Sequence, residues 1–248
     1  MPHDLPSQKT AYARFLAHCT PAPLIRVPGP AVRLDLSTNS PVWADNQDYR
    51  DLARFTARID GLLAAAGAAV GYGGYGEVRP VYTTPAFAEP GPDGQPRYRD
   101  THLGLDLWTA AGTPIYAPLS GRVHSRGFDP RPGTYGATLL LEHCPSPTLT
   151  FWTLYGHLDR ASLGAWSPGD PVAAGAPLAR IGHAPDNGGW PPHLHFQVTL
   201  DILDYHADYP GVAYPETAAT WLARCPDPAP LTGLPPENDG FGGPARSV

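Results

Sequence analysis

The stretch that decides the fold is Gly188-Gly189-Trp190-Pro191-Pro192-His193-Leu194-His195-Phe196-Gln197. Two histidines stand two positions apart in it, and apolar residues follow as far as Leu200. Residues i and i+2 of a β-strand point to the same face, so His193 and His195 would project side by side. Two such imidazoles can both bind a metal, or one can bind while the other moves protons. The simpler alternative is a surface strand with two unrelated histidines.

The sequence around this stretch, from Val81 to Leu200, is typical of an all-β domain. Short apolar segments alternate with turn signals such as Pro92-Asp93-Gly94 and Asp186-Asn187-Gly188-Gly189, and this spacing predicts a compact antiparallel sheet or sandwich. The 27 glycines and 32 prolines are spread between apolar runs, as expected of many short strands and turns. Hydrophobic residues make up 42% of the 248-residue chain, which is enough for a core.

The two ends of the chain have a different pattern. We predict a mostly helical segment over residues 1–24, followed by short strands at Leu24–Val27 and Val32–Leu36, an amphipathic helix over Asp48–Ala69, and a flexible or tightly turned run at Gly71–Gly76. Beyond the β domain we expect a short helix at Glu216–Arg224 and an extended or disordered tail from Cys225. The prediction is therefore mainly β: an N-terminal strand-helix extension at residues 1–79, a β-domain at 80–204, and a C-terminal segment with a short helix and a flexible tail at 205–248.

Charge and cysteine content exclude several classes of function. The net charge is −6 and Lys9 is the single lysine, so no basic patch for nucleic acid or for an anionic membrane is expected. No apolar run approaches about 20 residues, and residues 1–20 lack a basic-then-apolar leader, so we expect a cytoplasmic protein as written, or a cell-envelope protein if a leader was removed. The three cysteines are far apart and predict no disulfide scaffold. The oligomeric state is not indicated.

A second motif, Thr101-His102-Leu103-Gly104-Leu105-Asp106, contains a histidine and a carboxylate four residues apart. Both would lie on one face of a strand, and Gly104 argues against a helix. Imidazole and carboxylate are good zinc ligands. Together with one histidine of the His193/His195 pair they would supply three protein ligands and leave an open position, the arrangement of a catalytic zinc site.

A third motif, Trp152-Thr153-Leu154-Tyr155-Gly156-His157-Leu158, places a histidine at the end of an apolar strand. Alone, His157 is more simply a surface or capping residue. With the other two motifs present, a place in the same site is favoured.

Taken in order, the three motifs resemble those of the lysostaphin-type zinc metalloendopeptidases, which cut peptide cross-links in bacterial peptidoglycan. The framework segments Gly112–Pro118, Gly121–Val123 and Gly175–Ala179 are also similar, and the resemblance covers roughly residues 80 to 200. It implies one Zn²⁺ ion held by His102, Asp106 and His195. It also implies that His157 and His193 lie beside the metal without binding it and act in proton transfer.

The same resemblance implies a peptide or peptidoglycan fragment as substrate. Tyr155, Asn187 and Trp190, which lie in or next to the histidine-bearing motifs, are expected to contact it. Trp190 with its two prolines is bulkier and stiffer than the small loop usual in wall-cutting members, so it would reshape the substrate groove. No His-Glu-x-x-His helix exists, which excludes a thermolysin-like arrangement.

Other interpretations stay open or are excluded on specific residues. A non-catalytic or repurposed member that binds a ligand or regulates a partner is the main alternative. A biotinyl or lipoyl carrier is excluded, because Lys9 lies outside the β-rich half. For Arg79 a structural role is favoured over substrate contact. One further hypothesis is that the N-terminal segment covers the groove and keeps the enzyme latent, in which case a chain beginning near Val78 would be more active.

Overall fold

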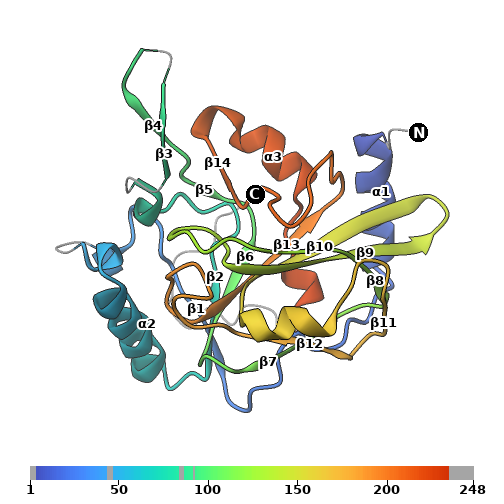
Figure 1. The fold of residues 1–248 in the computed structure, drawn as a ribbon, viewed down its shortest axis with the longest axis horizontal. Coiled ribbons are helices and arrows are strands. Elements are labelled where there is room, and N and C mark those ends of the chain that lie inside the picture. The colour runs from blue at the N-terminus through green and yellow to red at the C-terminus, as the bar shows by residue number, and fades with distance from the viewer. Residues whose placement is uncertain (1–3, 44–46, 84–86, 92, 235–248) are drawn as a thin grey trace, which may run out of the picture.

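The computed structural model describes residues 4–43, 47–83, 87–91 and 93–234. Within these ranges eight strands form a central sheet (Figure 1). Their order is β1 (Ala31–Arg33), β2 (Val70–Gly73), β6 (Leu105–Trp108), β13 (His193–Thr199), β10 (Leu149–Leu158), β9 (Ala137–Ser146), β8 (Gly121–Phe128) and β11 (Pro171–Val172). All neighbours are antiparallel except β1 and β2. The predicted mainly β, antiparallel class is confirmed.

Smaller elements surround this sheet. Three two-stranded sheets are formed by β7 (Pro114–Tyr116) with β12 (Pro177–Arg180), β5 (Thr101–His102) with β14 (Val212–Ala213), and β3 (Ala88–Pro90) with β4 (Pro96–Tyr98). The helices are α1 (Leu5–Leu16), α2 (Leu52–Ala66) and α3 (Ala218–Arg224), which lie around the edges of the sheet in Figure 1. Asp4 and Asp51 cap the first turns of α1 and α2, and Gly67 ends α2 in the left-handed conformation.

The alternation of side chains along the central strands separates the core from the site. Leu194, Phe196 and Val198 of β13 belong to the main core, where α1 also packs through Tyr12. His193 and His195 point to the opposite face, because successive residues of a strand alternate between faces. On that face Trp108, Phe55 and Trp43 form a second cluster, which brings α2 against the sheet beside the histidines.

The glycine-tyrosine run was predicted to be flexible or tightly turned, and for its first half this is wrong. Residues 70–73 form β2, which pairs with β1 on one side and with β6 on the other. Glycine is needed here because the preceding segment approaches closely: a Cβ on Gly71 would lie 2.6 Å from Leu34 Cδ1, and one on Gly73 would lie 2.5 Å from the Leu34 carbonyl oxygen.

Other elements differ in extent from the prediction. At Leu24–Val27 the structure has a single bridge, from Ile25 to Ile115, in place of a strand. Residues 225–234 were predicted as an extended or disordered tail, yet Cys225 and Leu231 are fully buried, so this prediction is wrong for the described part. The remainder of the tail, 235–248, lies outside the described residues. Among those described, no helix has the length and apolar character needed to cross a membrane.

The division of the chain at residues 79 and 204 stays a prediction. The first segment contributes β1 and β2 to the sheet that the middle segment builds. In the C-terminal segment, β14 pairs with β5, and the Leu200 amide donates to the Arg224 carbonyl. All three segments therefore share hydrogen bonds.

His143 is a buried histidine outside the three motifs, and from its burial we expect the protein to lose stability in acid. Burial lowers its pKa from 6.5 to about 4, while Nδ1 donates to the Ser120 carbonyl and Nε2 lies 2.8 Å from Thr153 Oγ1. The folded state thus favours the neutral ring, so stability is complete above pH 6.5 and falls as the pH drops toward 4. The gap between the two pKa values corresponds to roughly 3 kcal/mol.

Urea unfolding at a series of pH values checks this expectation. His143→Gln, which keeps a donor and an acceptor but does not titrate, is expected to remove about that much of the pH dependence. His183→Gln, at an exposed position, is the matched control and is expected to leave the dependence unchanged. Identical pH profiles for wild type and His143→Gln would contradict the assignment.

Candidate metal centre

Three neighbouring strands and one short strand bring the predicted residues together. In the sheet register Asp106 of β6 pairs with His195 of β13, and His195 pairs with Gly156 of β10. His102 of β5 reaches the same point from the adjoining two-stranded sheet. Gly104 makes room for this approach, because a Cβ there would lie 2.6 Å from the His195 ring.

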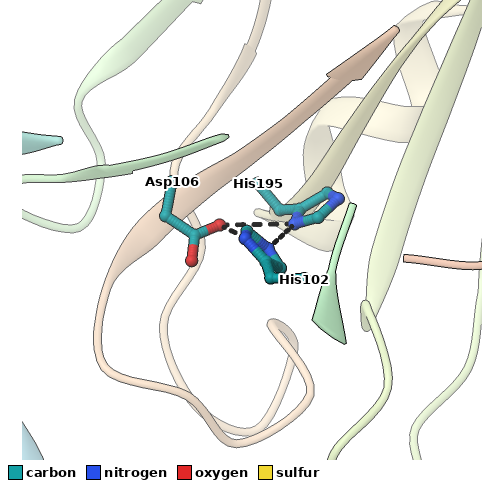
Figure 2. A group of neighbouring side chains, drawn as sticks. All are labelled: His102, Asp106 and His195. Atoms are coloured by element: carbon teal, nitrogen blue, oxygen red, sulfur yellow. Dashed lines mark hydrogen bonds and ion pairs between the residues drawn. The ribbon is translucent and has the colours of Figure 1, made fainter. Parts of the chain in front are cut away.

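His102, Asp106 and His195 form a compact buried cluster (Figure 2). His102 Nε2 and His195 Nδ1 lie 3.4 Å and 3.3 Å from Asp106 Oδ1, and 2.8 Å from each other. None of the three residues is more than 2% exposed. Figure 2 shows the other carboxylate oxygen of Asp106 pointing away from the imidazoles.

The far nitrogen of each cluster histidine is held by an acceptor. His102 Nδ1 lies 2.9 Å from the Gly74 carbonyl, and His195 Nε2 lies 2.9 Å from Gln197 Oε1. The Gln197 amide nitrogen in turn donates to the Pro210 carbonyl, which fixes its oxygen toward His195. A carbonyl oxygen accepts a hydrogen bond from the protonated ring nitrogen that it faces, so the opposite nitrogens turn lone pairs toward Asp106 Oδ1.

This donor set fits a zinc ion. Asp106 Oδ1 is buried and has no hydrogen-bond partner within the described residues, and it faces two lone-pair nitrogens. Three electron-rich atoms at such distances repel unless a cation lies between them. Ligands about 2.0–2.1 Å from a tetrahedral zinc are roughly 3.3–3.4 Å apart. The two nitrogen–carboxylate distances already match, and the two nitrogens need to separate by about half an ångström.

His157 and His193 lie beside the three cluster residues. Like His102 and His195, each has one ring nitrogen at a hydrogen-bond acceptor. His157 Nδ1 lies 2.9 Å from the Asn187 carbonyl and His193 Nδ1 lies 2.7 Å from the Pro191 carbonyl, so each turns Nε2 toward the site. Their ring centroids are 4.3 Å apart, and His193 Nε2 is 3.8 Å from Asp106 Oδ1. His193 also stacks on Trp108, at 4.1 Å between centroids.

Strand alternation alone would place His157 on the wrong face. Phe151 and Tyr155, at even spacing from it on β10, point into the main core. The pairing of β10 with β9 shifts between Tyr155 and Leu158, and His157 takes a φ of 62°. Such a bulge with left-handed backbone re-aims a side chain, and strain of this kind is typical of functional positions.

The electrostatics keep the imidazoles of His102, His157 and His193 neutral and the Asp106 carboxylate charged. Burial lowers the pKa of both His102 and His193 to about 4, and it lowers that of His157 well below its usual value. Burial by itself would raise the pKa of Asp106, but His102 and Arg79 outweigh it and hold this pKa well below the usual range. Neutral imidazoles and an ionised carboxylate are the forms that bind metal.

Arg79, for which the sequence favoured a structural role, contacts a predicted metal ligand directly. Its Nη1 donates to Asp106 Oδ2 at 2.5 Å and its Nε donates to Glu77 Oε2 at 2.5 Å, while Glu77 Oε1 accepts from the Leu36 amide at 3.0 Å. The guanidinium is 4% exposed. It thus leaves only Oδ1 of Asp106 for a metal and connects this ligand to the segment after β1.

Gly74 packs against both Arg79 and His102, which makes it a sensitive position. Its φ is +96°, and a Cβ would lie 1.8 Å from Arg79 Nη2 and 3.1 Å from His102 Nδ1. Gly74→Ala is therefore expected to displace both groups and weaken zinc binding by about 10- to 100-fold, the usual effect of losing a partner of a metal ligand. Competition with a chromophoric chelator measures this.

Gly76→Ala is the matched control for this substitution. Gly76 also has a left-handed φ, of +68°, but a Cβ there would meet nothing within 4 Å. It should cost about 1–2 kcal/mol of stability from backbone strain and leave zinc affinity unchanged. Equal zinc affinities for the two variants would show that the Gly74 contacts do not matter to the site.

A cleft of about 780 Å³ opens beside the cluster. His102, His157 and His195 line it together with an aromatic wall made of Tyr82, Phe87 and Trp190. Trp190 is anchored by a hydrogen bond from its indole nitrogen to the Thr134 carbonyl. The structure therefore places Trp190 where a substrate contact is available to it.

The other two residues predicted to bind substrate need correction. Tyr155 is fully buried in the main core against Phe196, because its position on β10 points away from the site. Asn187 is also fully buried. Its side-chain nitrogen donates to the Gly182 and Trp190 carbonyls, and its side-chain oxygen accepts from the Gly189 and Trp190 amides. Its backbone carbonyl orients His157. Asn187 organises the loop and Tyr155 fills the core.

The structure also disfavours the latency hypothesis in its simple form. A chain beginning at Val78 would lack the Gly74 carbonyl that holds His102 and the strand β2 that pairs with β6 beside Asp106. Part of the N-terminal segment is thus built into the site.

Comparisons with known proteins point to one family. Residues 100–204 match the model of "Peptidase family M23", and this range contains all three motifs. Similar solved structures include a zinc-containing peptidase from Vibrio cholerae (28% identity over 51% of this chain and 36% of that chain, TM-score 0.32). Another is the catalytic domain of the antimicrobial peptidase lysostaphin from Staphylococcus simulans (23% identity over 47% of this chain and 77% of that chain, TM-score 0.34). A third is a variant catalytic domain of the prophage-encoded M23 protein EnpA from Enterococcus faecalis (24% identity over 52% of this chain and 83% of that chain, TM-score 0.34).

The chain spans only about a third of the Vibrio protein, and TM-scores this low add no weight to the family match. A comparison with curated proteins finds no match.

Proposed function

Residues 100–204 belong to peptidase family M23, and from this membership we propose that the chain is a zinc-dependent metallopeptidase that hydrolyses peptide bonds. The resemblance to lysostaphin-type enzymes predicted from the three motifs is confirmed by the family match. The zinc dependence, the roles of the individual residues and the substrate are parts of the proposal.

One observation carries it: four buried histidines each have one ring nitrogen at an acceptor, and the other nitrogen of His102, His193 and His195 lies 3.3–3.8 Å from Oδ1 of the buried Asp106. Purely structural histidines do not need this common orientation. His102 Nε2, Asp106 Oδ1 and His195 Nδ1 would hold the ion, because they lie closest together. Three protein ligands leave a position open, as in catalytic zinc sites.

When bound there, zinc would supply a Lewis acid for the peptide carbonyl and lower the pKa of a water molecule toward neutrality. His157 and His193 supply the proton chemistry. As neutral imidazoles with Nε2 free, either can accept a proton from the attacking water and later donate one to the leaving amine. The protonated ring that forms in between would lie near Asp106, whose charge stabilises it.

The cleft beside the histidines is large enough for a peptide substrate. Its volume of about 780 Å³ accommodates several residues of an extended chain, and its aromatic wall suits peptide backbone and small side chains. Peptides with glycine and alanine, of the kind that cross-link peptidoglycan, are the class that the family membership favours. Bulky Trp190 would narrow the groove at one side.

A cleavage assay with metal removal tests the proposal. Purified protein is incubated with short glycine- and alanine-containing peptides and with peptidoglycan fragments, and new amino termini are quantified. We expect cleavage, its loss with a zinc chelator, and its recovery with about one equivalent of Zn²⁺. Stoichiometric zinc without cleavage of any such peptide would instead favour a ligand-binding member of the family.

A further inference from the structure

The cleft beside the metal centre contains an arginine whose charge is unpaired within the described residues. Three arginines line this cleft. Arg131 forms an ion pair with Asp129, and Arg126 donates a hydrogen bond to the Leu163 carbonyl. Arg99 forms no ion pair and no hydrogen bond to any described residue, and its Nε is buried without a partner.

Arg99 is connected to the metal centre along the aromatic wall. Tyr82 stacks on the ligand His102 at 6.2 Å between centroids, Phe87 contacts Tyr82 at 4.9 Å, and the Arg99 guanidinium lies over Phe87 at 6.0 Å. Two aromatic rings therefore separate Arg99 from His102, and both residues face the same cleft.

An unpaired guanidinium in this position needs an explanation. The buried Nε–H of Arg99 has no acceptor among the described residues, which costs free energy, while the residue as a whole is half-buried in the cleft. The chain as a whole carries a net charge of −6, so an acidic ligand gains little from long-range attraction and needs a local cation. The guanidinium fork matches a carboxylate in shape and charge better than any other common group.

We propose that Arg99 binds a carboxylate of the substrate, so that the enzyme acts on peptides with an acidic residue or a free carboxyl terminus near the cleaved bond. This inference rests on the proposed peptidase function and specifies its substrate class. An extended peptide advances about 3.3–3.6 Å per residue, so the two rings between Arg99 and His102 place the carboxylate a few residues from the bond that is cut.

Binding of isosteric peptides tests the proposal separately from cleavage. The zinc-loaded full chain carries His157→Ala to prevent turnover, and pentapeptides of glycine and alanine carry glutamate or glutamine at one position in turn. A second pair compares the free carboxyl terminus with its amide. Isothermal titration is expected to show that one acidic peptide binds about tenfold or more tightly than its neutral partner.

Variants at two arginines of the cleft assign this preference. In the same background Arg99→Gln is expected to abolish it, Arg99→Lys to retain part of it, and Arg131→Gln, whose charge is already paired with Asp129, to keep it. Zinc content and thermal midpoint are measured for each variant to exclude misfolding. Absence of any acidic preference overturns the proposal, and so does a preference that survives in Arg99→Gln, because the carboxylate would then bind a group other than Arg99.

The anionic subsite and the peptidase activity are tested by different outcomes of these experiments. Carboxylate-dependent binding through Arg99 without cleavage by the chain with intact His157 would contradict the peptidase and leave the anionic subsite standing. Cleavage of neutral and acidic peptides at equal rates, with equal binding, would contradict the subsite and leave the peptidase standing.

Discussion

A chain in which His195 is replaced by alanine is expected to lose its zinc and, with it, peptidase activity by a factor of about 10³ or more. His195 Nδ1 is one of three ligand atoms in the proposed site, and two remaining ligands do not hold the ion at micromolar concentration. The lost Lewis acid is worth several kcal/mol of transition-state stabilisation. Inductively coupled plasma mass spectrometry measures the zinc, and peptide cleavage measures the activity.

His193→Ala is the matched control, because His193 lies two residues away on the same face of β13. It is expected to keep one equivalent of zinc while its kcat falls by about 10²- to 10⁴-fold, the usual contribution of proton transfer. Loss of zinc in His193→Ala together with its retention in His195→Ala would exchange the two assignments. Full activity of zinc-free His195→Ala would refute the zinc-dependent reaction.

Replacing Arg79 with methionine is expected to destabilise the protein by about 3–5 kcal/mol and to weaken zinc binding. Asp106 and Glu77 both pair with this one guanidinium, so its removal leaves one buried and one partly buried carboxylate without their arginine partner. Asp106 would also lose the bond that holds Oδ2 away from the metal side. Urea unfolding of the zinc-free protein and chelator competition measure the two effects.

Arg79→Lys and Arg131→Gln are the controls for this prediction. Lysine keeps the positive charge but lacks the forked guanidinium that reaches both carboxylates. Arg79→Lys is therefore expected to retain more stability and zinc affinity than Arg79→Met, but less than the wild type. Arg131 pairs with Asp129 at the surface, and its loss should change neither. An Arg79→Met protein with wild-type stability and zinc affinity would show that the Arg79–Asp106 bond has no role in holding the site.

The general form of the site could be predicted from the sequence because strand spacing is simple. His193 and His195 share a face at a spacing of two, and Asp106 meets His195 in the register of β6 with β13. His102 could be predicted from its spacing of four residues to Asp106 in the second motif. These residues lie on or beside regular strands, where alternation determines which face a side chain occupies.

The errors arose where the chain departs from that regularity. The loop residue Asn187 turns inward because its amide satisfies four backbone groups, which no local pattern indicates. Tyr155 belongs to the same motif as His157, but only the bulge after Tyr155 brings His157 to the face of the site. Alternation counted from Phe151 would have indicated that Tyr155 belongs to the core.

The partners of the metal ligands were the least predictable part. Gly74 lies 28 residues before its partner His102, and Arg79 lies 27 residues before its partner Asp106. The pairing of β2 with β6 brings this segment to the site. Long-range pairing of this kind leaves no spacing rule in a single sequence. The glycine-tyrosine run was a signal, since consecutive glycines also occur where other groups approach the backbone closely.

Anomalous diffraction from crystals of the purified protein, recorded on both sides of the zinc absorption edge, tests the central claim most directly. We predict one strong zinc peak, about 2.0–2.2 Å from His102 Nε2, Asp106 Oδ1 and His195 Nδ1, with His157 and His193 near it but not bound. No peak at this position in zinc-saturated crystals, or a peak held by other residues, would contradict the metal centre and the peptidase function built on it.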